Sequence, residues 1–101
     1  MIELLAVPAW NTPPSTLDAW TEALRAQGVA VNVERDPPGA WLEVASLRLR
    51  GYALSEGLKV EAINFELSDT DSGPATRLLE AVAASLGWEI HPDEDDETDE
   101  D

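Results

Sequence analysis

Hydrophobic and polar residues alternate along much of this chain, which is the pattern of β-strands that bury one of their two faces. Proline, glycine and serine clusters, which favour turns, interrupt the alternation. The pattern predicts strands at residues 1–7, 29–35, 40–54, 58–68 and 88–91.

Two other segments carry apolar residues at helical spacing. The first has a capping-box pattern that starts at Ser15 and a glycine stop at Gly28, which predicts a helix over about 16–27. The second follows a capping segment, 71–72, and ends at Gly87. Their apolar faces are formed by Leu17, Trp20, Ala23 and Leu24, and by Leu78, Leu79, Val82 and Leu86.

The long strand segment 40–54 changes the parity of its apolar positions. Leu42 and Val44 share one face, whereas Leu47 and Leu49 share the other. A bulge or a tight bend near 45–46 restores all four to the buried side.

The resulting order is β-α-β-β-β-α-β. It predicts one α+β domain over residues 1–92, a two-layer sandwich of a mostly antiparallel sheet with both helices on one face. This order resembles the split β-α-β, ferredoxin-like plan with an added strand. The resemblance concerns topology and implies no particular function.

Acidity is the chief compositional feature. The chain has 101 residues and a net charge of −15, and eight of its 21 acidic residues lie at 93–101. Because that segment has no apolar residues to bury, we expect a disordered acidic tail. The remaining thirteen acidic and six basic residues leave −7 on residues 1–92, so the domain is acidic as well.

The same composition excludes several functions. There is no cysteine, hence no disulfide or thiolate metal site, and no apolar segment is long enough to span a membrane. We therefore expect a cytoplasmic protein. Direct binding to nucleic acid or to an anionic membrane lacks the basic residues it needs, so charged partners are basic proteins or cations.

Catalytic residues are scarce. His91 is the only histidine, and no nucleophile or phosphate-loop motif accompanies it. It lies beside Asp93, Glu94 and Asp95, which offer at most a weak cation site. We assign no catalytic residue, metal or cofactor, and we do not expect an enzyme.

A proline-rich loop after the first strand is one candidate site. Trp10, Asn11 and Thr12 lie between a strand end and a helix N-terminus, where α/β folds often bind anions. The acidity and the prolines favour a simpler interpretation, in which Trp10 packs across a capped helix start.

Tryptophan offers a second candidate. Trp41 has opposite parity to its buried neighbours and Trp88 is ambiguous, so one or both are expected on the open side of the sheet. Exposed aromatic residues on a sheet face are candidate partner contacts. Glu43, Glu61 and Glu66 are expected on the same side, where cross-strand ion pairs with arginines explain them without a substrate.

Three hypotheses follow. The leading one is a non-catalytic protein-interaction or regulatory module, monomeric or homodimeric, that binds a basic protein partner. Its candidate contacts are Trp10, Asn11, Thr12, Trp41, Trp88, Asp93, Glu94, Asp95 and Asp96. The alternatives are a binding domain for a small ligand or divalent cation, or a minimal enzyme, using the 10–15 loop, and an acidic chaperone, inhibitor or nucleic-acid mimic.

Overall fold

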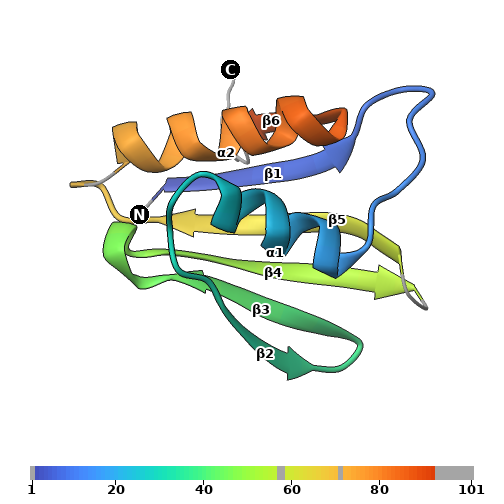
Figure 1. Cartoon of the computed structure of the whole chain (residues 1–101), viewed down its shortest axis with the longest axis horizontal. Coiled ribbons are helices and arrows are strands. Elements are labelled where there is room, and N and C mark those ends of the chain that lie inside the picture. Colours follow the sequence, from blue (N-terminus) through green and yellow to red (C-terminus); the bar gives the residue numbers. More distant parts are fainter. Residues whose placement is uncertain (1, 57–58, 71, 93–101) are drawn as a thin grey trace, which may run out of the picture.

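The computed structural model describes residues 2–56, 59–70 and 72–92, and they form an α+β fold of one antiparallel sheet and two helices (Figure 1). The elements along the chain are β1 (Ile2–Pro8), α1 (Leu17–Ala26), β2 (Asn32–Asp36), β3 (Gly39–Val44), the 3₁₀ turn η1 (Ala45–Leu47), β4 (Leu49–Glu56), β5 (Lys59–Leu67), α2 (Ser72–Leu86) and β6 (Trp88–Pro92). Neither described helix is long and apolar enough to cross a membrane. The predicted tail, 93–101, lies outside the described residues.

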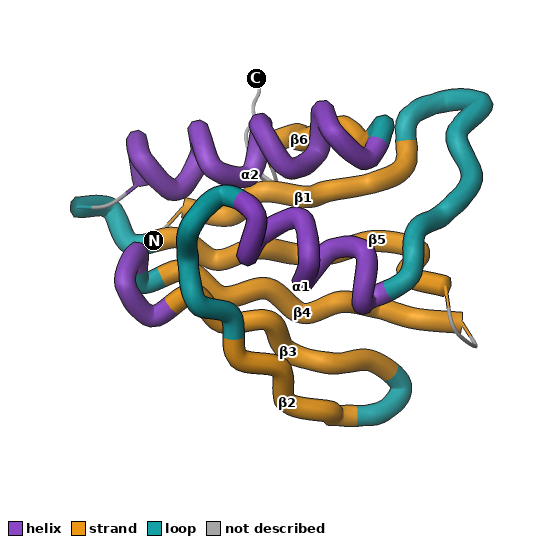
Figure 2. Tube along the Cα trace, in the orientation of Figure 1, coloured by secondary structure: helices purple, strands orange, loops and turns teal. Residues whose placement is uncertain are grey.

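The sheet has the strand order β2-β3-β4-β5-β1-β6, with every neighbouring pair antiparallel. Both helices lie on one side of it (Figure 2), as predicted. We call this side the covered face and the opposite side the open face. β1 pairs with β5 on one side and β6 on the other, so it lies inside the sheet, whereas β2 and β6 form its two edges.

Glycine ends both helices, as predicted, because Gly28 and Gly87 adopt positive φ angles of 92° and 77° that other residues rarely tolerate. The helix α1 begins one residue later than its capping pattern indicates. The N-cap is Thr16, whose hydroxyl accepts a hydrogen bond from the backbone N–H of Ala19 at 3.1 Å. Ser15 instead accepts a hydrogen bond from the indole Nε1 of Trp88 at 3.0 Å.

The prediction of a single strand over 40–54 is wrong, because this segment forms two strands, β3 and β4. The change of parity arises from η1, a turn that reverses the chain, so that β3 and β4 pair with Val44 opposite Leu49. Arg48 takes a left-handed conformation with φ of 51° to complete the reversal. The chain order is therefore β-α-β-β-β-β-α-β, one strand more than predicted.

The prediction of a half-buried strand over 29–35 is also wrong in its start and in its burial. The pairing of β2 begins at Asn32, and all five of its residues are exposed rather than half-buried. Val31, just before the strand, is buried, but Val33 is 40% exposed. The physical reason is position: β2 is an edge strand that lies beyond the helices (Figure 1), so little covers it.

The core lies between the helices and the covered face. Trp20 of α1 packs against Phe65 of β5 and, edge to face, against Trp88 of β6, with ring centroids 5.7 and 5.2 Å apart. All three side chains are buried. Gly51 makes room for the ring of Phe65, because a Cβ at this position would lie 2.5 Å from it. The core thus closes one face of the sheet and leaves the other to solvent.

Candidate functional site

The open face has an apolar centre. Alternation and the strand register place half-buried or exposed apolar side chains next to one another across β3, β4, β5 and β1. These residues are Leu5, Val7, Trp41, Tyr52, Leu54 and Ala62, and we call them the apolar band. The exposed Asn64 interrupts the band between Tyr52 and Leu5. Leu54 alone is 43% exposed. Within the described part of the chain, no helix or loop packs over this band.

Trp41 is the best-positioned member of the band. Its indole Nε1 donates a hydrogen bond to the Asp36 carboxylate at 3.2 Å, and its ring meets the ring of Tyr52 edge to face, with centroids 5.1 Å apart. The hydroxyl of Tyr52 donates to the backbone carbonyl of Asp36 at 2.8 Å. Two aromatic side chains from neighbouring strands are thus held by one residue at the end of β2.

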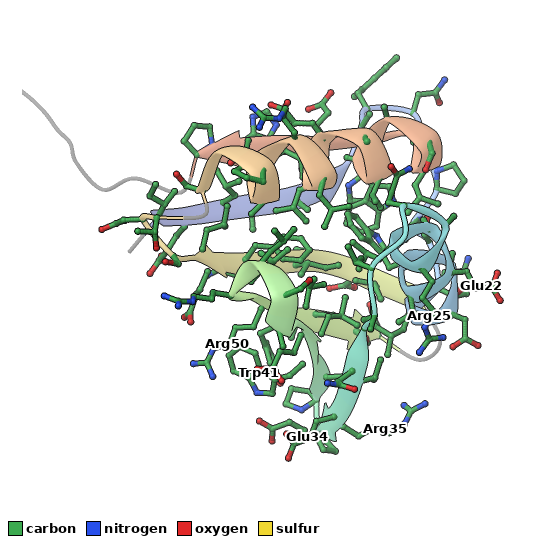
Figure 3. All side chains as sticks on the ribbon, turned by 60° about the vertical axis from the view of Figure 1, so that its left-hand side comes forward. Glu22, Arg25, Glu34, Arg35, Trp41 and Arg50 are labelled. Atoms are coloured by element: carbon green, nitrogen blue, oxygen red, sulfur yellow. The ribbon has the colours of Figure 1, made fainter. Side chains whose placement is uncertain are left out.

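A cation already lies on this tryptophan. The guanidinium of Arg50 is 4.5 Å from the ring centroid of Trp41, and its Nε donates to Glu66 at 3.0 Å. Figure 3 shows Arg50 and Trp41 side by side, on the side of the sheet away from α1. We call Asp36, Trp41, Arg50 and Tyr52 the Trp41 cluster. The ring of Trp41 thus accommodates a guanidinium group on its face.

Carboxylates surround the apolar band. The register places Glu43 opposite Arg50, and Glu34 directly opposite Trp41. Among the described residues, neither Glu34 nor Glu43 has an ion pair or a side-chain hydrogen bond. The acidic residues of the open face are Glu3, Glu34, Asp36, Glu43, Glu56, Glu66 and Glu89, against Arg50, Lys59 and His91 as the basic residues. The open face is therefore strongly acidic.

A depression of about 560 Å³ lies beside the Trp41 cluster. Two of the residues that line it, Glu34 and Glu43, supply carboxylates, Trp41 supplies an aromatic surface, and Arg50, which lies on the Trp41 ring, also borders it. An aromatic ring flanked by unpaired carboxylates matches the chemistry of a lysine or arginine side chain. The arrangement suits the binding of such a side chain.

Trp88 does not share this face. It is 5% exposed and belongs to the covered face, where its Nε1 hydrogen bond to Ser15 also fixes the start of the α1 region. Of the two tryptophans for which the open side was expected, only Trp41 lies there. The role of either residue in partner binding stays a prediction.

Trp10 is placed differently from its expected packing. It is 92% exposed, so the interpretation in which it packs across the helix start is wrong. A turn closed by a 2.9 Å hydrogen bond from Thr12 N–H to the Ala9 carbonyl carries it, with Asn11 at φ of 71°. The side chain of Thr12 borders Gly87. This loop follows β1, and β4 and β5 separate β1 from Trp41, so the two candidate sites are distinct.

The remaining sequence candidates form no common site. His91 lies on β6, with its Nε2 3.0 Å from the carboxylate of Glu89. Glu61 is separated from Glu43 and Glu66 by a register shift and interacts with Glu56, whose hydrogen bond and negative charge raise the pKa of Glu61. No group of three or more potential metal ligands occurs among the described residues. Asp93, Glu94, Asp95 and Asp96 lie outside those residues.

Sequence reasoning missed two members of the Trp41 cluster. Tyr52 alternates with the buried residues of β4, which was a usable signal once β4 was separated from β3. Asp36 gave no signal, because the sequence around it is typical of the start of a proline turn.

Comparison of the chain with protein-family models, with curated proteins and with solved structures gives no match. The geometry of the open face is therefore the basis for assigning a function.

Proposed function

We propose that this protein is a non-catalytic protein-interaction module whose open face binds a basic protein partner. The observation that carries the proposal is an uncovered apolar band that contains the preorganised Trp41 and Tyr52 side chains and is bordered by carboxylates. Protein interfaces commonly combine an apolar centre with a polar rim, and tryptophan, tyrosine and arginine supply most of their binding energy. The negative charge of the open face favours a basic partner.

The sheet topology supports this assignment. We read β4-β5-β1-β6 with α1 and α2 as a split β-α-β unit of the ferredoxin-like kind, to which the β2–β3 hairpin is added. The hairpin contributes Trp41, Asp36 and Glu34. On this interpretation the β2–β3 hairpin, which is the element added to the common architecture, supplies most of the aromatic and acidic groups of the proposed site. Functions differ among proteins of one fold because their sites differ.

Long-range attraction adds to these contacts. The net charge of −15 steers a basic partner toward the protein before contact, and added salt screens this effect beyond roughly 10 Å. The carboxylates of 93–101 contribute to the same attraction. We place the partner in the cytoplasm, in keeping with the absence of cysteine from the sequence.

A peptide-display selection against the full-length protein tests the proposal. We expect selected peptides to be rich in lysine and arginine, to lose affinity in high salt, and to bind Trp41→Ala at least about tenfold more weakly, since truncation of an interface aromatic typically costs that much. Trp10→Ala is the matched control, because Trp10 is an exposed tryptophan outside the open face. Its affinity should stay unchanged.

Heteronuclear NMR spectra first establish that both variants are folded. Peptides that are acidic or neutral, or that bind wild type and Trp41→Ala equally, would overturn the proposal. Selection of basic peptides whose binding depends on Trp10 rather than Trp41 would also overturn it, because the binding surface would then be the loop after β1.

A further inference from the structure

The outer edge of β2 is the most accessible strand edge of the described fold. β2 pairs only with β3, and each residue from Asn32 to Asp36 is exposed. Alternate residues of an edge strand direct both their N–H and C=O groups away from the sheet, where another extended chain can pair with them. Figure 1 shows β2 at the border of the sheet, farthest from α2.

The opposite edge is less suited to pairing. β6 lies against α2, its Trp88 is buried, and Ile90 packs against the core. It ends at Pro92, which has no backbone N–H to donate. The two edges therefore differ in access and in donors, and β2 is the edge on which a strand can be added.

The two sides of β2 carry different chemistry. Glu34 and Asp36 lie on the open face next to the Trp41 cluster, whereas Val33 and Arg35 lie on the other side. Figure 3 shows the side chains of Glu34 and Arg35 pointing in opposite directions from the strand. A strand added beside β2 alternates in the same way. One of its faces meets carboxylates, and its other face meets the half-exposed Val33.

A second copy of this chain is a poor occupant of the edge. In an antiparallel pair of two β2 strands that matches all five residues, Glu34 lies directly opposite its counterpart and Asp36 lies opposite Asn32. Like charges directly opposite each other destabilise strand pairing, and the net charge of −15 on each chain adds repulsion. The edge is thus protected against self-association while it attracts a basic strand.

We propose that β2 is a strand-addition site for an extended segment of the basic partner, with lysine or arginine facing Glu34 and the Trp41 cluster and apolar residues on the alternate side facing Val33. Backbone hydrogen bonds to the edge supply affinity, and the alternation supplies specificity. The depression lined by Glu34, Glu43, Trp41 and Arg50 receives a basic side chain from the added strand, which contacts the two carboxylates because Arg50 already lies on the Trp41 ring. This inference rests on the proposed function and deepens it.

The test uses the full-length protein and the synthetic peptide Lys-Val-Lys-Val-Lys-Val-Lys. Its control has the same charge but proline in place of the central valine, which removes a backbone donor and disfavours strand pairing. We expect the control to bind about tenfold more weakly, since it loses ladder hydrogen bonds. Hydrogen exchange should slow at alternate β2 amides when the first peptide binds.

Two charge-reversal variants locate the site. Glu34→Lys places a positive charge beside the added strand, and we expect it to weaken the alternating peptide by about tenfold or more. Glu22→Lys makes the same change of charge on the exposed surface of α1, as Figure 3 shows, and should alter affinity by no more than about twofold. NMR spectra of both variants establish that they are folded.

The outcomes separate this inference from the proposed function. If both peptides bind equally and perturb Trp41 without protecting β2 amides, strand addition is wrong and the open-face proposal stands. If no basic peptide binds at all, both are wrong. Protection of β2 amides in the protein alone, with a dimer in sedimentation, would show that a second copy occupies the edge and would overturn the inference.

Discussion

The two faces of this sheet are built on opposite principles. The covered face is a close-packed layer in which neighbouring side chains are complementary in shape, as the packing of Phe65 against Gly51 shows. The open face holds its aromatic residues by polar contacts, with Asp36 bonded to both Trp41 and Tyr52. Close packing is therefore concentrated on one face and the proposed recognition chemistry on the other, so substitutions on the two faces should affect different properties.

The largest effect is expected from Gly51→Ala on the covered face. The added Cβ would lie 2.5 and 2.6 Å from two atoms of the Phe65 ring and 2.9 Å from Cγ2 of Ile63, and both of these side chains are buried in the core. We expect a loss of about 2–3 kcal/mol in the free energy of unfolding, the cost of overpacking a core. Denaturant unfolding measures it.

Gly73→Ala is the matched control for that substitution. A Cβ at Gly73 would have the side chain of Arg77 as its nearest neighbour, at 3.9 Å, and the position lies in the first turn of α2. Here alanine should stabilise by roughly 0.5 kcal/mol, because it restricts the unfolded chain. Equal effects at the two glycines would contradict the contrast drawn between a packed face and an open surface.

A smaller effect is expected from Glu66→Gln on the open face. This change removes the charge that pairs with Arg50 at 3.0 Å, but both side chains are partly exposed, at 30% and 56%. Ion pairs in such positions contribute about 0.2–1 kcal/mol, so the free energy of unfolding should fall by less than about 1 kcal/mol. A loss as large as that of Gly51→Ala would mean that the open face also determines stability.

The smallest effect concerns pH. A hydrogen bond with Glu56, the repulsion of its charge and slight desolvation raise the pKa of Glu61 above its ordinary value of 4.5. The folded protein therefore binds this proton more tightly than the unfolded chain. The stabilisation is fully present below 4.5 and is lost as the pH rises through the raised pKa.

Glu56→Gln should remove that dependence. The variant lacks the repelling charge, so the pKa of Glu61 should fall toward its ordinary value, as an NMR titration of the carboxyl group would show. Unfolding at about pH 4 and about pH 7 should then differ less than in the wild type. Glu22→Gln serves as the control. An unchanged Glu61 titration in Glu56→Gln would disprove the coupling.

Local patterns predicted much of the covered face. Helical spacing identified the buried Trp20 and Leu24, and glycine positions identified both helix ends. The division between β3 and β4 was not decided, because a bulge and a turn produce the same change of parity. The exposure of Val33 was also missed, because it depends on which strand lies at the edge of the sheet, and alternation carries no information about strand order.

The open face was predictable in outline only. The parity of Trp41 placed it correctly, but its contacts with Asp36 and Tyr52 arise from the register of three strands. Trp10 was misjudged for a related reason. Its environment depends on the turn at Asn11, which presents the side chain to solvent, whereas the acidity and the prolines that favoured the packed interpretation do not specify that turn.

The interior position of β1 has a consequence for how the chain folds. Its two neighbours come from far along the sequence, since Ile2 pairs with Leu67 and Leu4 with Pro92. The strands from β2 to β5 follow one another and can pair through short connections, whereas β1 must close long loops on both sides. The four consecutive strands should therefore gain hydrogen-exchange protection before β1 in pulse-labelling experiments. Until β1 and β6 pair, the apolar face of the four strands is incompletely covered. This partly folded intermediate, rather than the native protein, is therefore the species most prone to aggregate.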